Sequence, residues 1–210
     1  MRLLYTPIAG YVHTVEAVIN YTGLRDAVEP VTTRPFEPDT PLARHNPVGK
    51  VPTLLLDDGE ALFGGPVIYE YLDTLHDRPP LHPREGRRRF TVLRQAWMAD
   101  ALFDQFVLLV VEGWLYTDRI REDHVQRTWR KVTAILDRME AEAGVDGTPD
   151  IGQFRAVGAL SFLDLKVAQV GAQVPAIDPG FDWRDGRPAL AAWFGALSGD
   201  PVFREPLRVA

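Results

Sequence analysis

The sequence of 210 residues predicts an α/β domain followed by an all-α domain. Within residues 1–77, short β-type runs alternate with helical patterns in the order βαβ and then ββα. Beyond residue 86 the strand signals vanish, and apolar residues recur at helical spacing over long stretches. Residues 78–85 contain three prolines and form the natural linker. The two predicted domains therefore span residues 1–77 and 86–210.

The first half of the α/β domain has the pattern strand, helix, strand. Arg2–Tyr5 is a short β-type run. A helix is predicted over about residues 11–21, and Gly23 is expected to end it as a C-terminal cap. Ala27–Thr32 is predicted as a second strand. The proline-rich stretch Pro35–Pro41 then excludes a regular helix.

The second half is centred on Asn46–Leu72. Thr53–Leu56 is a short apolar strand, and Asp58-Gly59 is a strong hairpin signal before a second short strand. Gly64-Gly65 breaks that strand, and Pro66 suits the first position of a helix. The apolar residues of this helix recur at helical spacing: Val67, Ile68, Tyr71, Leu72 and Leu75.

The second domain is predicted to be helical throughout. Periodic apolar residues indicate helices over about residues 87–116 and 122–143, with a loop over 144–149. Ser161-Phe162-Leu163-Asp164 has the form of a capping box before an apolar run, so a helix is expected to begin there. The motif is short and arises often by chance.

The composition is that of an ordinary soluble globular protein and excludes several functions. A formal net charge of −6 argues against a nucleic-acid surface, and the basic run Arg87-Arg88-Arg89 is typical of a solvated helix face. The absence of cysteine excludes disulfides, thiolate nucleophiles and thiolate metal ligands. The five histidines lack paired spacing, so no metal site is predicted.

No apolar run reaches the roughly 18 residues that suggest a membrane span. Met1–Tyr5 has the pattern of a strand rather than of a signal peptide. We therefore expect a cytoplasmic protein with neither a membrane nor a nucleic acid as its partner.

The segment Asn46-Pro47-Val48-Gly49-Lys50-Val51-Pro52, with the hairpin and the glycine-started helix after it, resembles the thioredoxin-like domain of glutathione transferases. The helical half, from the Ser161–Asp164 motif to the tail over residues 187–203, is similar to the all-helical domain of the same family. The resemblance covers nearly the whole chain and is greatest to bacterial stand-alone members. It implies a glutaredoxin-type βαβ-ββα domain followed by the family's helical domain.

The resemblance also implies glutathione as a co-substrate, bound by main chain and side chains at positions that match the family's site. These positions are Lys50, Val51, Pro52, Gly64, Gly65 and Asp100. The Val51–Pro52 bond is expected to be cis, which exposes the N–H and C=O of Val51 to the peptide. Asp100 aligns with an acidic position that reaches across the dimer in relatives. A homodimer is therefore expected, with Tyr69 as one exposed aromatic contact.

The group that stabilises the thiolate is less obvious. Ala9 and Gly10 stand where many bacterial members of the family have a Ser-Pro pair. Tyr5 falls where the tyrosine-type classes keep their hydroxyl, with Thr6 beside it, and these two are the predicted catalytic residues. The alternative for Tyr5 is a core tyrosine. Tyr11 is expected to line the acceptor pocket or to cap the first helix.

Gly64 and Gly65 replace an acidic residue and a serine of the family pattern. We expect the free N–H groups of Val67 and Ile68, at the positive end of the helix dipole, to attract a carboxylate still. Glutathione binding should nonetheless be weakened. Introducing aspartate and serine at these positions should strengthen it unless either glycine has a positive φ.

The acceptor side is predicted from aromatic residues, namely Tyr11, Trp97, Phe103 and Trp114. Aromatic residues at helical spacing are more often core residues.

The fold and the site residues together leave two functions open. One is a transferase that conjugates or reduces a small electrophile with glutathione. The other is a non-catalytic binding protein on the same fold, and a third, weaker option is a different anionic thiol as the ligand.

Overall fold

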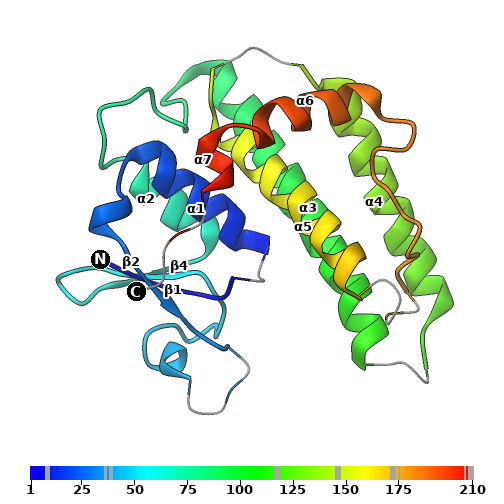
Figure 1. Ribbon diagram of the computed structural model, residues 1–210, viewed down its shortest axis with the longest axis horizontal. Coiled ribbons are helices and arrows are strands. Elements are labelled where there is room, and N and C mark those ends of the chain that lie inside the picture. The colour runs from blue at the N-terminus through cyan, green and yellow to red at the C-terminus, as the bar shows by residue number, and fades with distance from the viewer. Residues whose placement is uncertain are drawn as a thin grey trace.

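The computed structural model describes residues 1–7, 10–35, 37, 40–115, 119–144, 148–170, 174, 176–205 and 207. It confirms the predicted fold class, with a small mixed sheet and its helices in one domain and long helices in the other. In Figure 1 the two domains lie side by side, with α3 and α5 closest to the sheet domain and α4 on the outer side.

The sheet contains β1 (Arg2–Tyr5), β2 (Glu29–Thr32), β3 (Thr53–Leu55) and β4 (Ala61–Phe63). The strand order is β2-β1-β3-β4. The pair β1–β2 is parallel, because a helical crossover connects them, and the other pairs are antiparallel. The predicted order βαβ-ββα is therefore confirmed.

The register of this sheet brings three chain segments to one of its ends. Thr53 opens β3 and pairs with Leu4 near the end of β1 on one side and with Phe63 at the end of β4 on the other. The segment after β1, the loop before β3 and the turn after β4 consequently meet at the same end of the sheet.

The helices α1 (Gly10–Thr22) and α2 (Gly65–Leu72) cover the sheet face that carries Leu3 and Tyr5. As predicted, Gly23 follows α1 with a left-handed φ of 74°. The second strand begins later than expected, because Arg25–Ala27 forms a 3₁₀ turn.

The opposite face of the sheet buries Leu4 and Leu55. Leu42 covers them from the short 3₁₀ helix Pro41–Arg44. Both faces of the sheet are therefore covered.

The helical domain consists of α3 (Gly86–Leu115), α4 (Glu122–Glu142), α5 (Ile151–Val170), α6 (Pro188–Ser198) and α7 (Pro201–Arg204). The first four share one apolar core. In Figure 1, α6 crosses the ends of the long helices and α7 returns to α1. Asn20 of α1 fixes this return by donating to the carbonyls of Val202 and Glu205, at 2.9 and 2.8 Å.

The helix expected to begin at Ser161 begins ten residues earlier, so the capping-box prediction is wrong. Ser161 and Asp164 lie inside α5, where the main-chain N–H groups already have helical partners. Asp150 performs the capping, accepting from the N–H of Gln153 at 3.1 Å. Asp164 instead accepts a hydrogen bond from the Trp183 indole at 2.7 Å and pairs with Arg184.

The segment between α2 and α3 is tied to the end of α2 by Asp73. Its buried carboxylate accepts from the main-chain N–H groups of Leu81 and His82, each at 2.8 Å. The rings of His82 and His76 contact the same carboxylate at 2.9 and 3.1 Å. Burial alone would raise the pKa of Asp73, but these hydrogen bonds outweigh it and hold the pKa at about 2.

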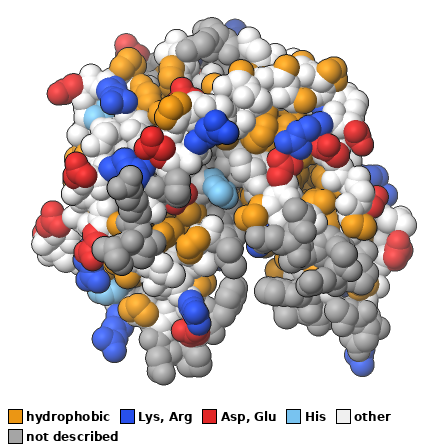
Figure 2. All heavy atoms as spheres, in the orientation of Figure 1, with side chains coloured by type: hydrophobic (Ala, Val, Ile, Leu, Met, Phe, Trp, Pro, Cys, Tyr) orange, Lys and Arg blue, Asp and Glu red, His pale blue; other side chains and the backbone are white. Residues whose placement is uncertain are grey.

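No helix within the described ranges is both long enough and apolar enough to cross a membrane. On the face seen in Figure 2, charged side chains of both signs are scattered among exposed hydrophobic ones.

Candidate glutathione site

The loop before β3 is shaped by the side chain of Asn46, which is only 2% exposed. Its amide donates to the carbonyl of Lys50 at 2.8 Å and to the hydroxyl of Thr53 at 3.0 Å. Its carbonyl oxygen accepts from the N–H of Val48 at 2.8 Å, which makes an Asx turn. Asn46 was not among the predicted site residues, although an asparagine at the start of a turn is a signal for this arrangement.

The Val51–Pro52 bond, for which the sequence predicts cis, is cis in the structure. The Lys50 carbonyl points inward to Asn46 and Thr53, while the Lys50 side chain is exposed. Neither the N–H nor the C=O of Val51 has a partner among the described residues. This loop can therefore offer one donor and one acceptor to an extended peptide.

The first turn of α2 differs from the prediction. The N–H groups of Val67 and Ile68 are not free, because both donate to the carbonyl of Gly64, at 3.0 and 3.2 Å. Pro66 has no N–H. Gly65 therefore supplies the N–H that this turn can offer to an anion.

The geometry of the two glycines also overturns the expected benefit of aspartate and serine. Gly64 has a φ of 86°, a conformation that side chains rarely adopt. A Cβ at Gly65 would lie 2.6 Å from the hydroxyl oxygen of Tyr69. Substitution is strained at the first position and sterically blocked at the second.

The two predicted catalytic hydroxyls both face protein. Tyr5 is 2% exposed and belongs to the core beneath α1. Its pKa is raised, first by burial and then by the charge of Glu16. The Thr6 hydroxyl donates to the carbonyl of Thr33. In this arrangement Tyr5 has the position of a core tyrosine.

Tyr11 and Phe103, predicted to line the acceptor pocket, lie together where the domains meet. Their ring centroids are 4.2 Å apart, and the ring of Phe162 lies 4.4 Å beyond Phe103. The Tyr11 hydroxyl donates to Asp104 at 3.4 Å. Burial, and then the charge of Asp104, raise the pKa of Tyr11, so its phenol keeps its proton.

Trp97 does not join this group. It precedes Phe103 by six residues on α3, which turns it about 240° around the helix axis. Its side chain is 69% exposed. The side chain of Trp114 and the whole of Ala9 lie outside the described residues, whereas Gly10 begins α1.

Asp100 is buried and paired within its own chain. Arg155 of α5 donates from Nε to its carboxylate at 2.7 Å. The guanidinium carbon of Arg155 lies 6.0 Å from the centre of the Tyr69 ring. Tyr69 itself is 0% exposed, so the prediction of an exposed contact residue is wrong. Its hydroxyl donates to the carbonyl of Tyr11 at 3.2 Å, so the buried polar group has a hydrogen-bond partner.

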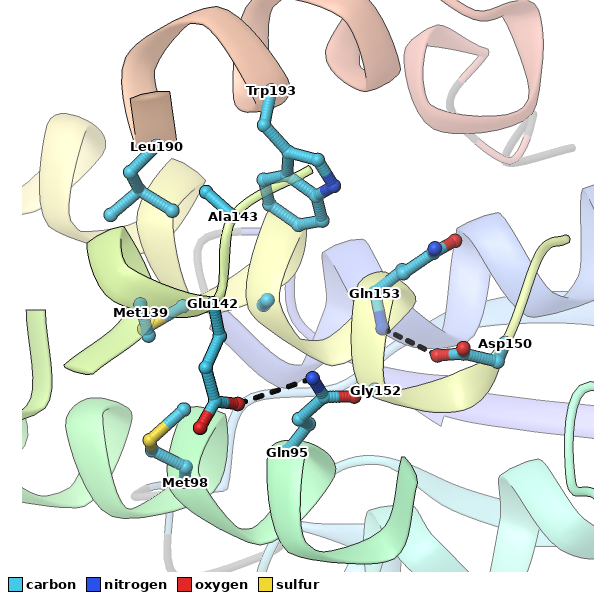
Figure 3. A pocket seen from close by; sticks show the side chains of 11 residues that line it. Gln95, Met98, Met139, Glu142, Ala143, Asp150, Gly152, Gln153, Leu190 and Trp193 are labelled. Atoms are coloured by element: carbon cyan, nitrogen blue, oxygen red, sulfur yellow. Dashed lines mark hydrogen bonds between the residues drawn. The ribbon is translucent and has the colours of Figure 1, made fainter. Parts of the chain in front are cut away.

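A separate cavity of about 50 Å³ lies inside the helical domain, between α3, α4, α5 and α6 (Figure 3). Its polar groups already have partners. Glu142 binds Arg94 and Gln95 at 2.9 and 3.2 Å, and Asp150 caps α5. It is not part of the site at the sheet end. In the part of the chain that the structure describes, no cluster of histidines or carboxylates could hold a metal ion.

A thioredoxin-like domain that presents a cis-proline loop beside a helix start, packed against a helical domain, defines the class of protein. Residues 10–75 match the family model described as "Glutathione S-transferase, N-terminal domain". Together with a relative that is 31% identical over 96% of each chain, described next, this match shows that the chain belongs to the glutathione transferase family.

Individual relatives agree with this assignment. A glutathione transferase family member from Pseudomonas fluorescens Pf-5, solved with bound glutathione, is 31% identical, with 96% of each chain covered and a TM-score of 0.85. A glutathione S-transferase from Methylobacillus flagellatus KT, solved with glutathione bound, is 27% identical, with 97% and 96% covered and a TM-score of 0.84. The uncharacterized GST-like protein YibF of Escherichia coli K12 is 28% identical over 148 residues, which are 70% of this chain and 72% of YibF.

Proposed function

We propose that the protein is an enzyme that conjugates or reduces a small electrophile with glutathione. The observation that carries the proposal is the main chain of Val51, which has no partner among the residues that the structure describes and lies at the same sheet end as the first turn of α2. An extended peptide on this loop would pair with Val51. The N–H of Gly65, at the positive end of the α2 dipole, suits the γ-glutamyl carboxylate. The glutathione held by related structures supports this choice of ligand.

Binding should be weak, because Gly64 and Gly65 offer no side chain to the γ-glutamyl end. A charge-assisted hydrogen bond is worth about 1.5–3 kcal/mol, so its absence raises the dissociation constant by about one to two decades. Asp100 is not assigned to the ligand's ammonium group, since Arg155 already pairs with it.

Tyr11 is our candidate for the donor that stabilises the thiolate. It is the half-buried phenol of the first turn of α1, and its raised pKa keeps the proton that a hydrogen bond to sulfur requires. That proton would leave the long hydrogen bond to Asp104, at 3.4 Å, and turn to the sulfur. In conjugation, the thiol proton passes to solvent and the sulfur attacks the electrophilic carbon as the leaving group departs. In reduction, a second glutathione thiol attacks the bound sulfur. Glutathione disulfide then leaves, and the acceptor carbon keeps the electron pair and gains a proton.

The acceptor site is built from aromatic rings. Tyr11 and Phe103, both partly buried, have ring centroids 4.2 Å apart, and Phe162, which is 4% exposed, supports Phe103 from the core at 4.4 Å. Such rings favour flat apolar groups, which stack on them in offset or edge-to-face arrangements. We therefore propose an apolar, aromatic electrophile.

Calorimetric titration with glutathione tests the proposal, followed by turnover of an aryl halide. We expect binding in the high micromolar to millimolar range. Tyr11→Phe should lower kcat by about tenfold or more and leave the dissociation constant unchanged, because its hydroxyl matters to the anion. Binding without turnover in the wild type would favour the non-catalytic binding protein. Absence of binding would mean that the site takes another ligand.

We also propose that the protein forms a homodimer through α3. Phe90, Trp97 and Leu108 are 71%, 69% and 42% exposed and follow one face of this helix. Val67 at the start of α2 adds an apolar side chain that is 52% exposed. Light scattering should give twice the chain mass, and Trp97→Glu should give the monomer. A monomeric wild type at micromolar concentration would contradict the dimer.

The cytoplasmic location remains a prediction.

A further inference from the structure

We propose that Tyr69 is a positioning residue that fixes the first turns of α1 and α2 relative to each other, with Arg155 of the helical domain beside its ring. The inference rests on the proposed function, because these two turns are the part of the site that would hold glutathione. The ligand would touch the turns, and Tyr69 would act through them.

The first contact is with the start of α2. Tyr69 lies one helical turn after Gly65, and its side chain folds back over that turn. A Cβ at Gly65 would lie 2.6 Å from the Tyr69 hydroxyl oxygen and 2.9 Å from ring carbon Cζ. The phenol therefore occupies the space that any side chain at position 65 would need. Position 65 must be glycine as long as position 69 is tyrosine.

The second contact is with the start of α1. The same hydroxyl donates to the main-chain carbonyl of Tyr11 at 3.2 Å. Tyr69 is completely buried, so this hydrogen bond has no water to replace it. One oxygen atom thus joins the turn that carries the Gly65 N–H to the turn that carries Tyr11, the proposed thiolate donor.

The third contact comes from the other domain. The guanidinium carbon of Arg155 lies 6.0 Å from the centre of the Tyr69 ring, at a distance typical of a cation–π contact. Asp100 of α3 holds this guanidinium through the hydrogen bond from Nε. The pair Asp100–Arg155 therefore links α3 and α5 to the phenol, and through it to the ligand site in the first domain.

The test begins with calorimetric titration of glutathione into the wild type and into Tyr69→Phe, which removes the oxygen and keeps the ring. Tyr69→Phe removes the hydrogen bond to the Tyr11 carbonyl and a hydrogen bond with the Thr14 side chain, both on α1, and we expect the dissociation constant to rise about fivefold or more. The glutathione KM should rise in step, with kcat at saturating glutathione unchanged. A loss of packing alone would lower the melting temperature without raising the glutathione KM at constant kcat. Tyr71→Phe, on the same helix, is the matched control and should bind as the wild type does.

The second arm is a thermal-unfolding cycle of Gly65→Ala and Tyr69→Phe. Gly65→Ala should lower the melting temperature. The double variant should lose less than the sum of the two single changes, because the closest atom, the oxygen at 2.6 Å, is gone and only the ring carbon at 2.9 Å still has to shift. Gly195→Ala is the control, since nothing lies within 4 Å of its added Cβ.

Additive melting temperatures or an unchanged dissociation constant in Tyr69→Phe would overturn the proposal. A wild type that binds no glutathione would overturn the proposed function and the ligand half of this inference. The unfolding cycle would then still test whether Tyr69 and Gly65 are energetically coupled, because it does not depend on glutathione.

Discussion

The loop before β3 and the first turn of α2 lie at the same end of the sheet, yet their main chains are held in place differently. In the loop, the buried amide of Asn46 donates a hydrogen bond to the carbonyl of Lys50 and leaves Val51 open. In the helix start, the phenol of Tyr69 packs against Gly65 and leaves no room for a side chain.

The comparison shows that a site built from main-chain groups depends on side chains that face away from the ligand. The loop depends on polar bonds, which a single substitution removes. The helix start depends on shape, because Gly64 needs its positive φ and Gly65 needs its missing Cβ. We therefore expect the loop to be the more fragile half.

The largest effect is expected for Asn46→Ala. It removes three hydrogen bonds, two of them to main-chain groups, and leaves the buried Thr53 hydroxyl with one partner fewer. Unfolding in urea should show a loss of about 3 kcal/mol. Asn46→Asp keeps the acceptor for the Val48 N–H and should lose less. If Asn46→Ala costs no more than Gly64→Ala, the contrast between the two halves is wrong.

Asp73, at the C-terminal end of α2, is likewise held by polar hydrogen bonds. Asp73→Asn should lower the free energy of unfolding by about 2 kcal/mol at pH 7. The folded-state pKa of Asp73, about 2, lies below its ordinary value of 3.8. Its contribution is therefore fully present above about pH 4 and is lost as the pH falls towards 2. Unfolding of both proteins at pH 7 and at pH 2.5 should show the difference shrinking. A constant difference would contradict the assigned pKa.

Gly64→Ala should have a smaller effect, about 1 kcal/mol, because no atom obstructs the new Cβ and only the left-handed φ penalises it. The matched variant is Gly23→Ala, which also adds a methyl group in open space at a positive φ. Equal losses in the two variants would assign the effect to backbone strain alone. A loss of glutathione affinity in Gly64→Ala only would connect it to the site.

The smallest effect is expected for Tyr5→Phe. The Tyr5 ring is in the core and the substitution keeps it, so stability should change by about 1 kcal/mol or less. Turnover of an aryl halide should stay within about a factor of two, in contrast to Tyr11→Phe. A kinetic assay in which Tyr5→Phe is inactive and Tyr11→Phe is active would return the catalytic role to Tyr5.

The sequence by itself determined the order of the elements and the family. Periodicity and turn residues are local signals, which is why α1 with its cap Gly23, the hairpin at Asp58-Gly59 and the loop over residues 46–52 could all be predicted. The same local reasoning misplaced the start of α5, because the Ser161–Asp164 pattern fits a helix start and a helix interior equally well.

Only the tertiary structure decided which side chains serve the site. Tyr69 was expected to be exposed on its helix but is fully buried, with Arg155 from the other domain over its ring. Trp97 and Phe103 both suited a pocket, and only the structure separates them, because the Phe103 ring contacts Tyr11 of α1 whereas Trp97 is 69% exposed. The physical reason is that burial and hydrogen-bond partners are set by residues distant in sequence. The sequence gives each residue its chemistry but not its neighbours in space.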